Sequence, residues 1–257
     1  MSTTHDGVNI EVSAGVLRLA LSRPDRMNAV NAGTLASMTE AVEAAAGDPE
    51  ARVIVITGEG RAFCSGADLA DEEGPTVRTL DEANRLVLAL RRSPRPVLAA
   101  VNGAAAGVGC SLALAADIVV ARESAYFLLA FARIGLMPDG GATALVTASI
   151  GRARAARMAM LAERITAPMA LEWGLISAVA GDSDFDSTVS GMVDQLVAGP
   201  PLGFARTKLA LDEAALTNLE SVMAVERAGQ AFLLESADFA EGVAAFGEKR
   251  PATFTGH

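Results

Sequence analysis

Two short runs of apolar residues, each followed at once by a glycine-containing bend, constrain this sequence more than any other feature. Residues 53–57 read VIVIT and lead into the bend GEG, and residues 97–101 read VLAAV and lead into NG. Continuous apolar runs of this length are typical of strands buried on both faces. Because helical periodicity returns after each bend, we predict an α/β core in which right-handed crossovers connect parallel strands.

Neighbouring segments fit the same class of fold. Residues 16–24 alternate between apolar and polar positions and stop at a proline, which predicts a strand. Residues 32–49 have helical spacing and end at a glycine and a proline, which predicts a helix with a stop signal. Residues 71–80 are acidic and contain glycine and proline, so we expect a mobile surface segment before a helix over residues 81–94.

The second half of the chain becomes mostly helical beyond residue 151. A Pro-Pro pair at residues 200 and 201 predicts a boundary between a core, residues 1–199, and a C-terminal helical region, residues 200–257. The helices of this region carry Phe, Met and Leu on one face. Such a face is covered either by the protein's own core or by another subunit, and both alternatives stay open at this point.

Composition limits the classes of ligand. The 257 residues carry a net charge of -10 and have a sequence pI near 4.7, which argues against nucleic acid and anionic membranes as partners. An anionic small molecule needs only a local basic patch. The N-terminus has neither the basic nor the apolar region of a signal peptide, and the apolar run 111–121 is too short for a membrane span and contains Asp117.

Cysteine and histidine usage excludes several kinds of site. Cys64 and Cys110 lie far apart without metal-type spacing, which indicates reduced thiols and a cytoplasmic protein. The two histidines, His5 and His257, lie at opposite ends of the chain, which we expect to fray. A Ser-His-Asp hydrolase therefore lacks its base, and we expect no metal site.

The glycine bends offer backbone chemistry. Residues 61–69 read RAFCSGADL, and residues 101–114 read VNGAAAGVGCSLAL, with Gly103, Gly107 and Gly109 in a spacing unlike that of a dinucleotide-binding loop. Glycine lets the backbone approach a ligand, and the start of a helix carries free N–H groups. Each bend alone is compatible with an ordinary tight turn. Two bends together can place two N–H donors on one oxygen, which makes an oxyanion hole.

Five stretches of the sequence together resemble the crotonase superfamily, the enoyl-CoA hydratase/isomerase fold: LSRPDRMNAVN, GRAFCSGADL, RPVLAAVNGAAAGVGCSLALAADIVVA, FARIGLMPDGGA and EWGLISAV. They span nearly the whole chain in the expected order. The resemblance implies a spiral of ββα turns, a C-terminal helical region for trimerisation, and a homotrimer or a dimer of trimers. It also implies an acyl-CoA ligand, with the coenzyme A thioester as substrate and no further cofactor.

The same resemblance assigns two oxyanion donors, the N–H of Ala67 after Gly66 and the N–H of Val108 after Gly107. The family commonly has glycine at the position of Val108, so the valine side chain is expected to narrow the pocket. Hydratases of the family carry glutamates at the positions of Ser111 and Phe131. Because neither glutamate is present here, ordinary hydration is not expected.

One carboxylate, that of Asp139, lies close in sequence to the position of Phe131, within the stretch GLMPDGGA. From local sequence, aspartate before a helix is a preferred N-cap. The resemblance to the 1,2-epoxyphenylacetyl-CoA isomerase branch instead implies proton transfer by Asp139. The function expected is therefore an acyl-CoA double-bond isomerase, with a weak enoyl-CoA hydratase or an inactive acyl-CoA-binding scaffold as alternatives.

Residues that bind the rest of the ligand follow from the same resemblance. Arg23, Arg26 and Lys249 are candidates for the coenzyme A phosphates, with Lys249 reaching a neighbouring subunit's ligand; each is otherwise an ordinary surface charge. Asp68 and Leu69 are expected along the adenine edge. An apolar wall would raise the pKa of the Asp139 carboxyl, unless its members only pack the core. The wall consists of Leu128, Phe131, Leu136 and Met137, and the other expected substrate-binding residues are Gly66, Gly107 and Ser111.

Overall fold

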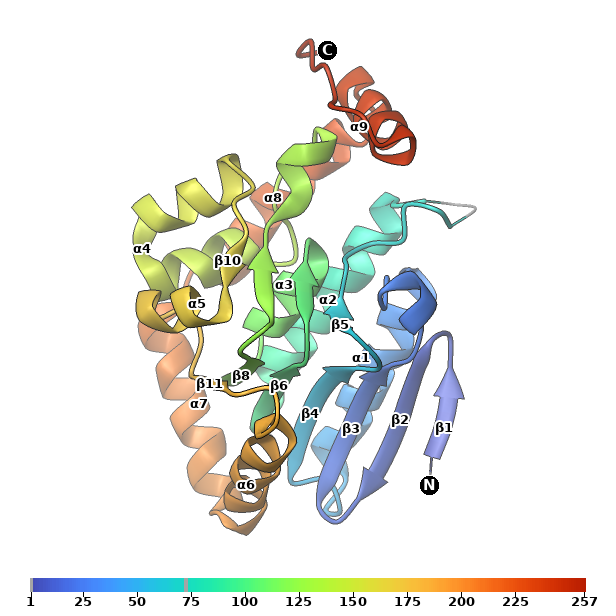
Figure 1. Ribbon diagram of the computed structural model, residues 1–257. Helices are drawn as coiled ribbons and strands as arrows, with labels where there is room; N and C mark the ends of the chain where they lie inside the picture. The colour runs from blue at the N-terminus through green and yellow to red at the C-terminus, as the bar shows by residue number, and fades with distance from the viewer. Residues whose placement is uncertain (1, 72–73) are drawn as a thin grey trace.

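The two apolar runs become neighbouring strands of one sheet, and the bends after them lead into strands of a second sheet (Figure 1). This computed structural model describes residues 2–71 and 74–257. The seven-stranded sheet has the order β1 (Ser2–His5), β2 (Val8–Ser13), β3 (Val16–Leu21), β4 (Val53–Gly58), β6 (Val97–Val101), β8 (Ile118–Arg122) and β11 (Ala178–Ala180). The four-stranded sheet has the order β10 (Ile165–Thr166), β9 (Tyr126–Leu128), β7 (Ala104–Ala106) and β5 (Ala62–Cys64).

The chain climbs through these sheets as a spiral. Each turn contributes one strand to the large sheet, one strand to the small sheet, and then a helical segment: β4–β5–α2, β6–β7–α3, and β8–β9–η2–α4. Strands β4, β6 and β8 pair in parallel, as do β5, β7 and β9. The predicted α/β fold, a spiral of ββα turns, is therefore confirmed.

Nine α-helices and two short 3₁₀ helices accompany the strands in the described residues. Their bounds are η1 (Pro24–Arg26), α1 (Ala32–Gly47), α2 (Val77–Arg92), α3 (Val108–Leu114), η2 (Ala130–Ile134), α4 (Ala142–Met160), α5 (Ala167–Trp173), α6 (Phe185–Ala198), α7 (Pro201–Ala215), α8 (Leu219–Leu233) and α9 (Ala237–Glu248). Helix α2 begins four residues earlier than the sequence predicted, because Thr76 forms a capping box with Thr79. Residues 77–80 of the segment predicted to be mobile therefore belong to α2, and Leu80 is buried. Residues 72–73 of that segment lie outside the described residues.

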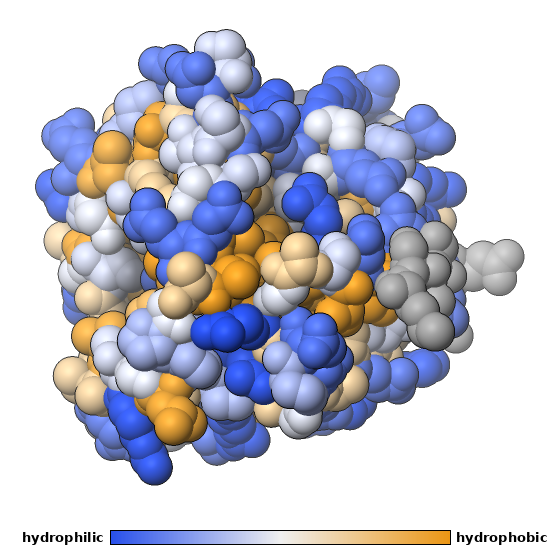
Figure 2. Space-filling view, turned by 90° about the horizontal axis from the view of Figure 1, so that it is seen from below, coloured by the Kyte–Doolittle hydropathy of each residue, from blue (hydrophilic) through white to orange (hydrophobic). Residues whose placement is uncertain are grey.

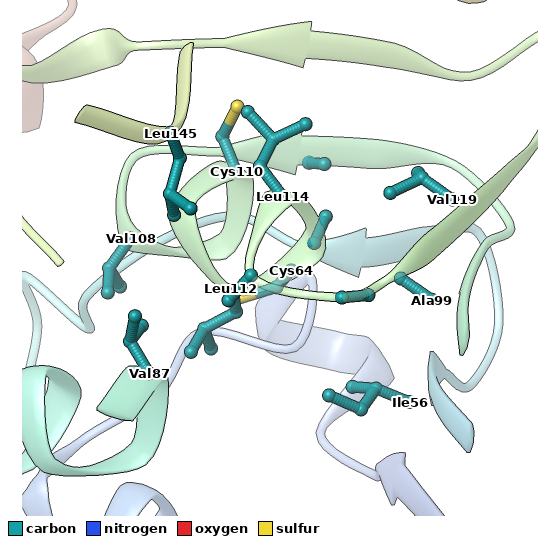
Figure 3. Packing of buried hydrophobic residues seen from close by; sticks show 14 of the residues in the cluster. Ile56, Cys64, Val87, Ala99, Val108, Cys110, Leu112, Leu114, Val119 and Leu145 are labelled. Atoms are coloured by element: carbon teal, nitrogen blue, oxygen red, sulfur yellow. The ribbon is translucent and has the colours of Figure 1, made fainter. Parts of the chain in front are cut away.

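The apolar strands are buried on both faces, as their composition predicts. In β4, Ile54 and Ile56 face the main core, while Val53 and Val55 face a second cluster beneath α6. Figure 3 shows Ile56, Ala99 and Val119 of adjacent strands beside Leu112 and Leu114 of α3. On the surface seen from below, hydrophobic residues form a band at the centre of a mostly polar face (Figure 2).

Both ends of the chain are held, contrary to the expectation that the histidines fray. Ser2–His5 form β1, in which His5 pairs with Val8 across a tight turn. At the other end, the carbonyl of His257 accepts a hydrogen bond from the Asp238 N–H. The edge strand β1 and its neighbour β2 escaped the sequence analysis, because β2 is only half-buried and lacks a continuous apolar run.

The C-terminal helices are divided between core and surface. Leu219 and Met223 of α8 are buried in the main core, so the protein's own core covers part of the apolar face of the C-terminal helices. Six large apolar side chains of α7, α8 and α9 are exposed: Leu202, Leu209, Leu211, Val225, Phe232 and Phe246. The division of the chain at residue 200 and trimerisation both stay predictions. In the described residues, no helix is long and apolar enough to cross a membrane.

Candidate active site

The two glycine bends lie against each other, and their glycines make that contact possible. A side chain at Gly103 would overlap the Arg61 carbonyl, and one at Gly109 would lie 2.6 Å from the Cys64 Cβ. Gly103 and Gly109 therefore allow two segments of the same chain to pack closely. The expectation that their backbone approaches a ligand is wrong. A Cβ on Gly107 would lie 3.5 Å from the Gly66 Cα, so these two bends touch at their tips.

The amide of Ala67 points away from the strand pairing beside it. Val30 forms an isolated parallel bridge with Ala67, in which the Val30 N–H donates to the Gly66 carbonyl and the Asp68 N–H donates to the Val30 carbonyl. In a parallel bridge of this kind, both bonds go to the residues on either side of Ala67, so the Ala67 N–H faces the opposite direction. Ala67 also lines a cavity.

The amide of Val108 is the first of helix α3, where N–H groups have no partner within the helix. Gly107 before it has φ 53° and ψ -132°, a backbone conformation that is sterically unfavourable for residues with a Cβ. The Val108 side chain points toward Val87 of α2 (Figure 3), although the residue also lines the cavity. Predicted donors Ala67 and Val108 therefore share one cavity.

This cavity has a volume of about 520 Å³ and a predominantly apolar wall. Of the predicted wall, Leu128, Phe131 and Leu136 line it, together with Leu80 of α2. Met137 does not, because its sulfur packs against Gly229 of α8 and its N–H donates to Gln230. Gly66, Gly107, Asp68 and Leu69 line the cavity as predicted substrate-binding positions.

Asp139 lies in the loop between η2 and α4 and lines the same cavity while being 8% exposed. Burial raises the pKa of its carboxyl to about 7; the hydrogen bond from Gln230 lowers it, and the charge of Glu226 raises it. Its Oδ2 accepts the Gln230 Nε2–H at 2.8 Å, whereas its buried Oδ1 has no hydrogen-bond partner among the described residues.

The alternative that Asp139 caps helix α4 is wrong. The N-cap of α4 is Gly141, and no side chain at that position makes the cap. The carboxylate of Glu226, on α8, takes that role by accepting the Gly141 N–H at 2.7 Å and the Thr143 N–H at 2.8 Å. The Asp139 carboxylate therefore does not bind the N–H groups at the start of α4.

Two buried residues of this site, Glu226 and Gln230, escaped the sequence analysis. They lie four residues apart on α8, and are 1% and 2% exposed. The available signal was the stretch VERAGQ, in which two polar side chains at helical spacing fall among the apolar positions of the helix. Nothing in the local sequence connects them to Asp139, which is 91 residues away from Gln230.

Ser111 is not at the cavity surface. It is fully buried in α3, and its hydroxyl donates to the backbone carbonyl of Asp139 at 2.8 Å. The prediction that Ser111 binds substrate is therefore wrong: its side chain turns into the core and holds the loop that carries Asp139. Gly140, the next residue of that loop, packs against Ser111, since a Cβ at Gly140 would lie 3.0 Å from the Ser111 Cβ.

The basic candidates differ in how strongly their side chains are already paired and in whether they line the cavity. Arg23 donates to the Asp68 carboxylate at 2.7 Å and to the Ala29 carbonyl, so its guanidinium is occupied. Arg26 is half exposed, lies 3.5 Å from Asp68 and lines the cavity. Lys249 ends helix α9 in an exposed left-handed position and does not line the cavity of its own chain.

Neither cysteine lines the cavity. Cys64 and Cys110 are buried free thiols, and burial raises the pKa of each to about 12. Within residues 2–71 and 74–257, no three His, Cys, Asp or Glu side chains are grouped to hold a metal ion. The Trp173 ring packs against the guanidinium groups of Arg154 and Arg157.

A two-sheet ββα spiral with two glycine bends that meet at an apolar cavity defines a protein of the crotonase superfamily. Within it, the chain belongs to the enoyl-CoA hydratase/isomerase family, whose sequence profile matches residues 11–257. Enzymes of this family act on acyl-CoA substrates.

Named relatives agree on the family and differ in activity. A probable enoyl-CoA hydratase of Rhodobacter capsulatus is 47% identical, over 97% of this chain and 98% of the relative. The 1,2-epoxyphenylacetyl-CoA isomerase of Escherichia coli is 40% identical, over 95% of this chain and 97% of the relative. Among solved structures, an enoyl-CoA hydratase from Mycobacterium avium subsp. paratuberculosis superimposes with a TM-score of 0.92 at 46% identity, covering 97% of this chain and 98% of that one.

Proposed function

We propose that this protein is an acyl-CoA double-bond isomerase in which Asp139 transfers the proton. The observation that carries the proposal is the Asp139 carboxylate: it is buried, lines the cavity shared by Ala67 and Val108, and has an unpartnered Oδ1. A carboxyl whose pKa is about 7 is a stronger base than an ordinary aspartate and still ionises at neutral pH.

The reaction proposed begins with a 3-enoyl thioester whose carbonyl oxygen accepts the N–H groups of Ala67 and Val108. Asp139 removes a proton from C2, and the electron pair of that C–H bond delocalises onto the carbonyl oxygen to give a dienolate. The two amides stabilise this charge more than that of the ground-state carbonyl. Asp139 then returns the proton to C4, so that the double bond ends between C2 and C3, with no net gain or loss of atoms.

Beyond the reacting carbons, we propose that Arg26 binds a phosphate of coenzyme A and that Asp68 and Leu69 contact its adenosine end. Gly66, Gly107 and Phe131 complete the substrate site, and the thioester is substrate without any further cofactor. A homotrimer or dimer of trimers would cover exposed apolar side chains of α7 to α9 and bring Lys249 to a neighbouring subunit's ligand. The free thiols support the proposal that the enzyme works in a reducing cytoplasm.

Hydration of a 2-enoyl-CoA is the main competing activity, since a relative at 47% identity is named a probable hydratase. The purified protein tests this directly when it is supplied in parallel with 3-hexenoyl-CoA and with crotonyl-CoA. We expect formation of the conjugated thioester from 3-hexenoyl-CoA and little loss of conjugation from crotonyl-CoA. Rapid hydration of crotonyl-CoA would overturn the isomerase assignment. Binding of both thioesters without turnover would instead favour an inactive scaffold.

The isomerase should depend on pH through Asp139. Only the ionised carboxylate accepts the C2 proton, and its pKa is about 7. The value of kcat/KM should therefore rise about tenfold per pH unit up to about pH 7 and level off above it. The measurement is kcat/KM from about pH 5 to about pH 9, with protein stability checked at each pH. A profile that is flat across this range would contradict a base with the pKa of Asp139.

A further inference from the structure

Gln230 of α8 lines the cavity beside Asp139, and two hydrogen bonds hold its side-chain amide in one orientation. Its Oε1 accepts the Met137 N–H at 3.1 Å, and its Nε2–H donates to Asp139 Oδ2 at 2.8 Å. A flipped amide would place its NH₂ group against the Met137 N–H and its carbonyl against the Asp139 carboxylate. Both contacts would then be repulsive, so the Met137 N–H determines which end of the amide faces Asp139.

The two oxygens of Asp139 consequently differ. Oδ2 is occupied by Gln230, and Oδ1 is buried without a partner. We propose that Gln230 is the positioning residue of the Asp139 carboxylate: it holds Oδ2 and leaves Oδ1 as the oxygen that exchanges the proton with the acyl chain. This inference rests on the proposed isomerase function and adds a residue to it.

The surroundings of Asp139 show why one hydrogen bond should matter. Glu226, one turn before Gln230 on α8, raises the pKa of the Asp139 carboxyl by its charge, and the Gln230 hydrogen bond lowers it. On the α3 side, Val108 and Ser111 carry no titratable group. The other charged residues that line the cavity are Asp25, Arg26, Asp68 and Arg133.

The test is Gln230→Met, which keeps the length of the side chain and removes both hydrogen bonds. With 3-hexenoyl-CoA at pH 7, kcat should fall by about 10- to 100-fold because the carboxylate loses its orientation. KM should change by less than about threefold, and the apparent pKa in kcat/KM should move above its wild-type value. Met223→Leu is the matched control, since Met223 is buried on the same helix and packs against Gly141 through apolar contacts.

A second readout does not depend on activity. The ¹³C NMR titration of the Asp139 carboxyl, assigned by its loss in Asp139→Asn, should shift upward in Gln230→Met and stay unchanged in Met223→Leu. An unchanged titration together with an unchanged kcat would overturn the inference. If the titration shifts but Asp139→Asn retains full isomerase activity, the proposed function fails while the positioning contact is supported.

Gln230→Glu keeps the inference testable if the methionine variant does not fold. Its carboxylate can still accept the Met137 N–H, but its other oxygen would face Asp139 Oδ2 where a donor is needed. The two carboxyl groups must then share a proton, so the apparent pKa should rise by at least about one unit. Activity lost at pH 7 should partly return toward pH 9. Wild-type kinetics and titration in this variant would overturn the inference.

Discussion

Asp139→Asn is expected to lower kcat for double-bond migration by about 10² to 10⁴-fold, the range typical of a lost general base. Asparagine has nearly the same shape and keeps an oxygen for the Gln230 Nε2–H, but it cannot accept a proton from carbon. The measurement is the rate of conjugated thioester formation from 3-hexenoyl-CoA at pH 8, where Asp139 of the wild type is ionised. Affinity for coenzyme A thioesters should change by less than about threefold.

The same variant should gain stability at neutral and alkaline pH. Since the pKa of Asp139 is raised to about 7 from 3.8, the folded chain holds a proton that the unfolded chain releases between these values. The free energy of unfolding contributed by this group therefore falls as the pH rises from about 4 to about 7, by up to about 4 kcal/mol, and is constant above. Urea titrations of both proteins at pH 5 and pH 8 measure the difference. An Asn variant with wild-type activity would contradict the proposed base.

Val108→Pro should lower kcat by about 10²- to 10³-fold, corresponding to about 2.7–4 kcal/mol for one lost oxyanion donor. Val108 is the first residue of α3, the helix position at which proline is best tolerated, because its N–H has no helical partner. Gly107 before it has φ 53° and ψ -132°, the mirror image of the extended conformation favoured before proline, and a glycine can adopt this mirror image because it has no Cβ. The substitution thus removes one N–H group with little other change.

Val108→Ala is the matched control for that experiment. It keeps the N–H and removes part of the side chain that packs toward Val87 (Figure 3). Its kcat should stay within about threefold of wild type, although its stability should fall by about 1 kcal/mol or more because a buried side chain is shortened. Equal activity of the proline and alanine variants would show that the Val108 amide does not stabilise the transition state.

Sequence patterns predicted those parts of the fold that local chemistry controls. The runs at 53–57 and 97–101 form buried strands, as their composition predicted, and Gly107 adopts a positive-φ conformation that other residues rarely take. Family resemblance placed Ala67, Val108 and Asp139 in one site, and the structure brings all three to one cavity. The edge strand β1 and its neighbour β2 carried too weak a sequence pattern to be found.

Side-chain direction was the main source of error. Ser111 and Met137 lie within the correct motifs, but Ser111 points to the Asp139 carbonyl and Met137 toward α8. The glycines at 103 and 109 were interpreted as ligand contacts, yet each admits the backbone of the neighbouring bend. A motif identifies a position along the chain, whereas direction depends on which element packs beside it.

Residue order alone specified the alternation of buried strands and glycine bends, because both follow from short-range sterics and burial of apolar runs. It left the role of Asp139 open between helix cap and base. The tertiary structure excludes the cap: Glu226 reaches Gly141 from 85 residues away and caps α4, while Gln230 and the apolar cavity surround the Asp139 carboxylate. The physical reason is that desolvation and hydrogen-bond partners are properties of the packed chain, not of its local segments.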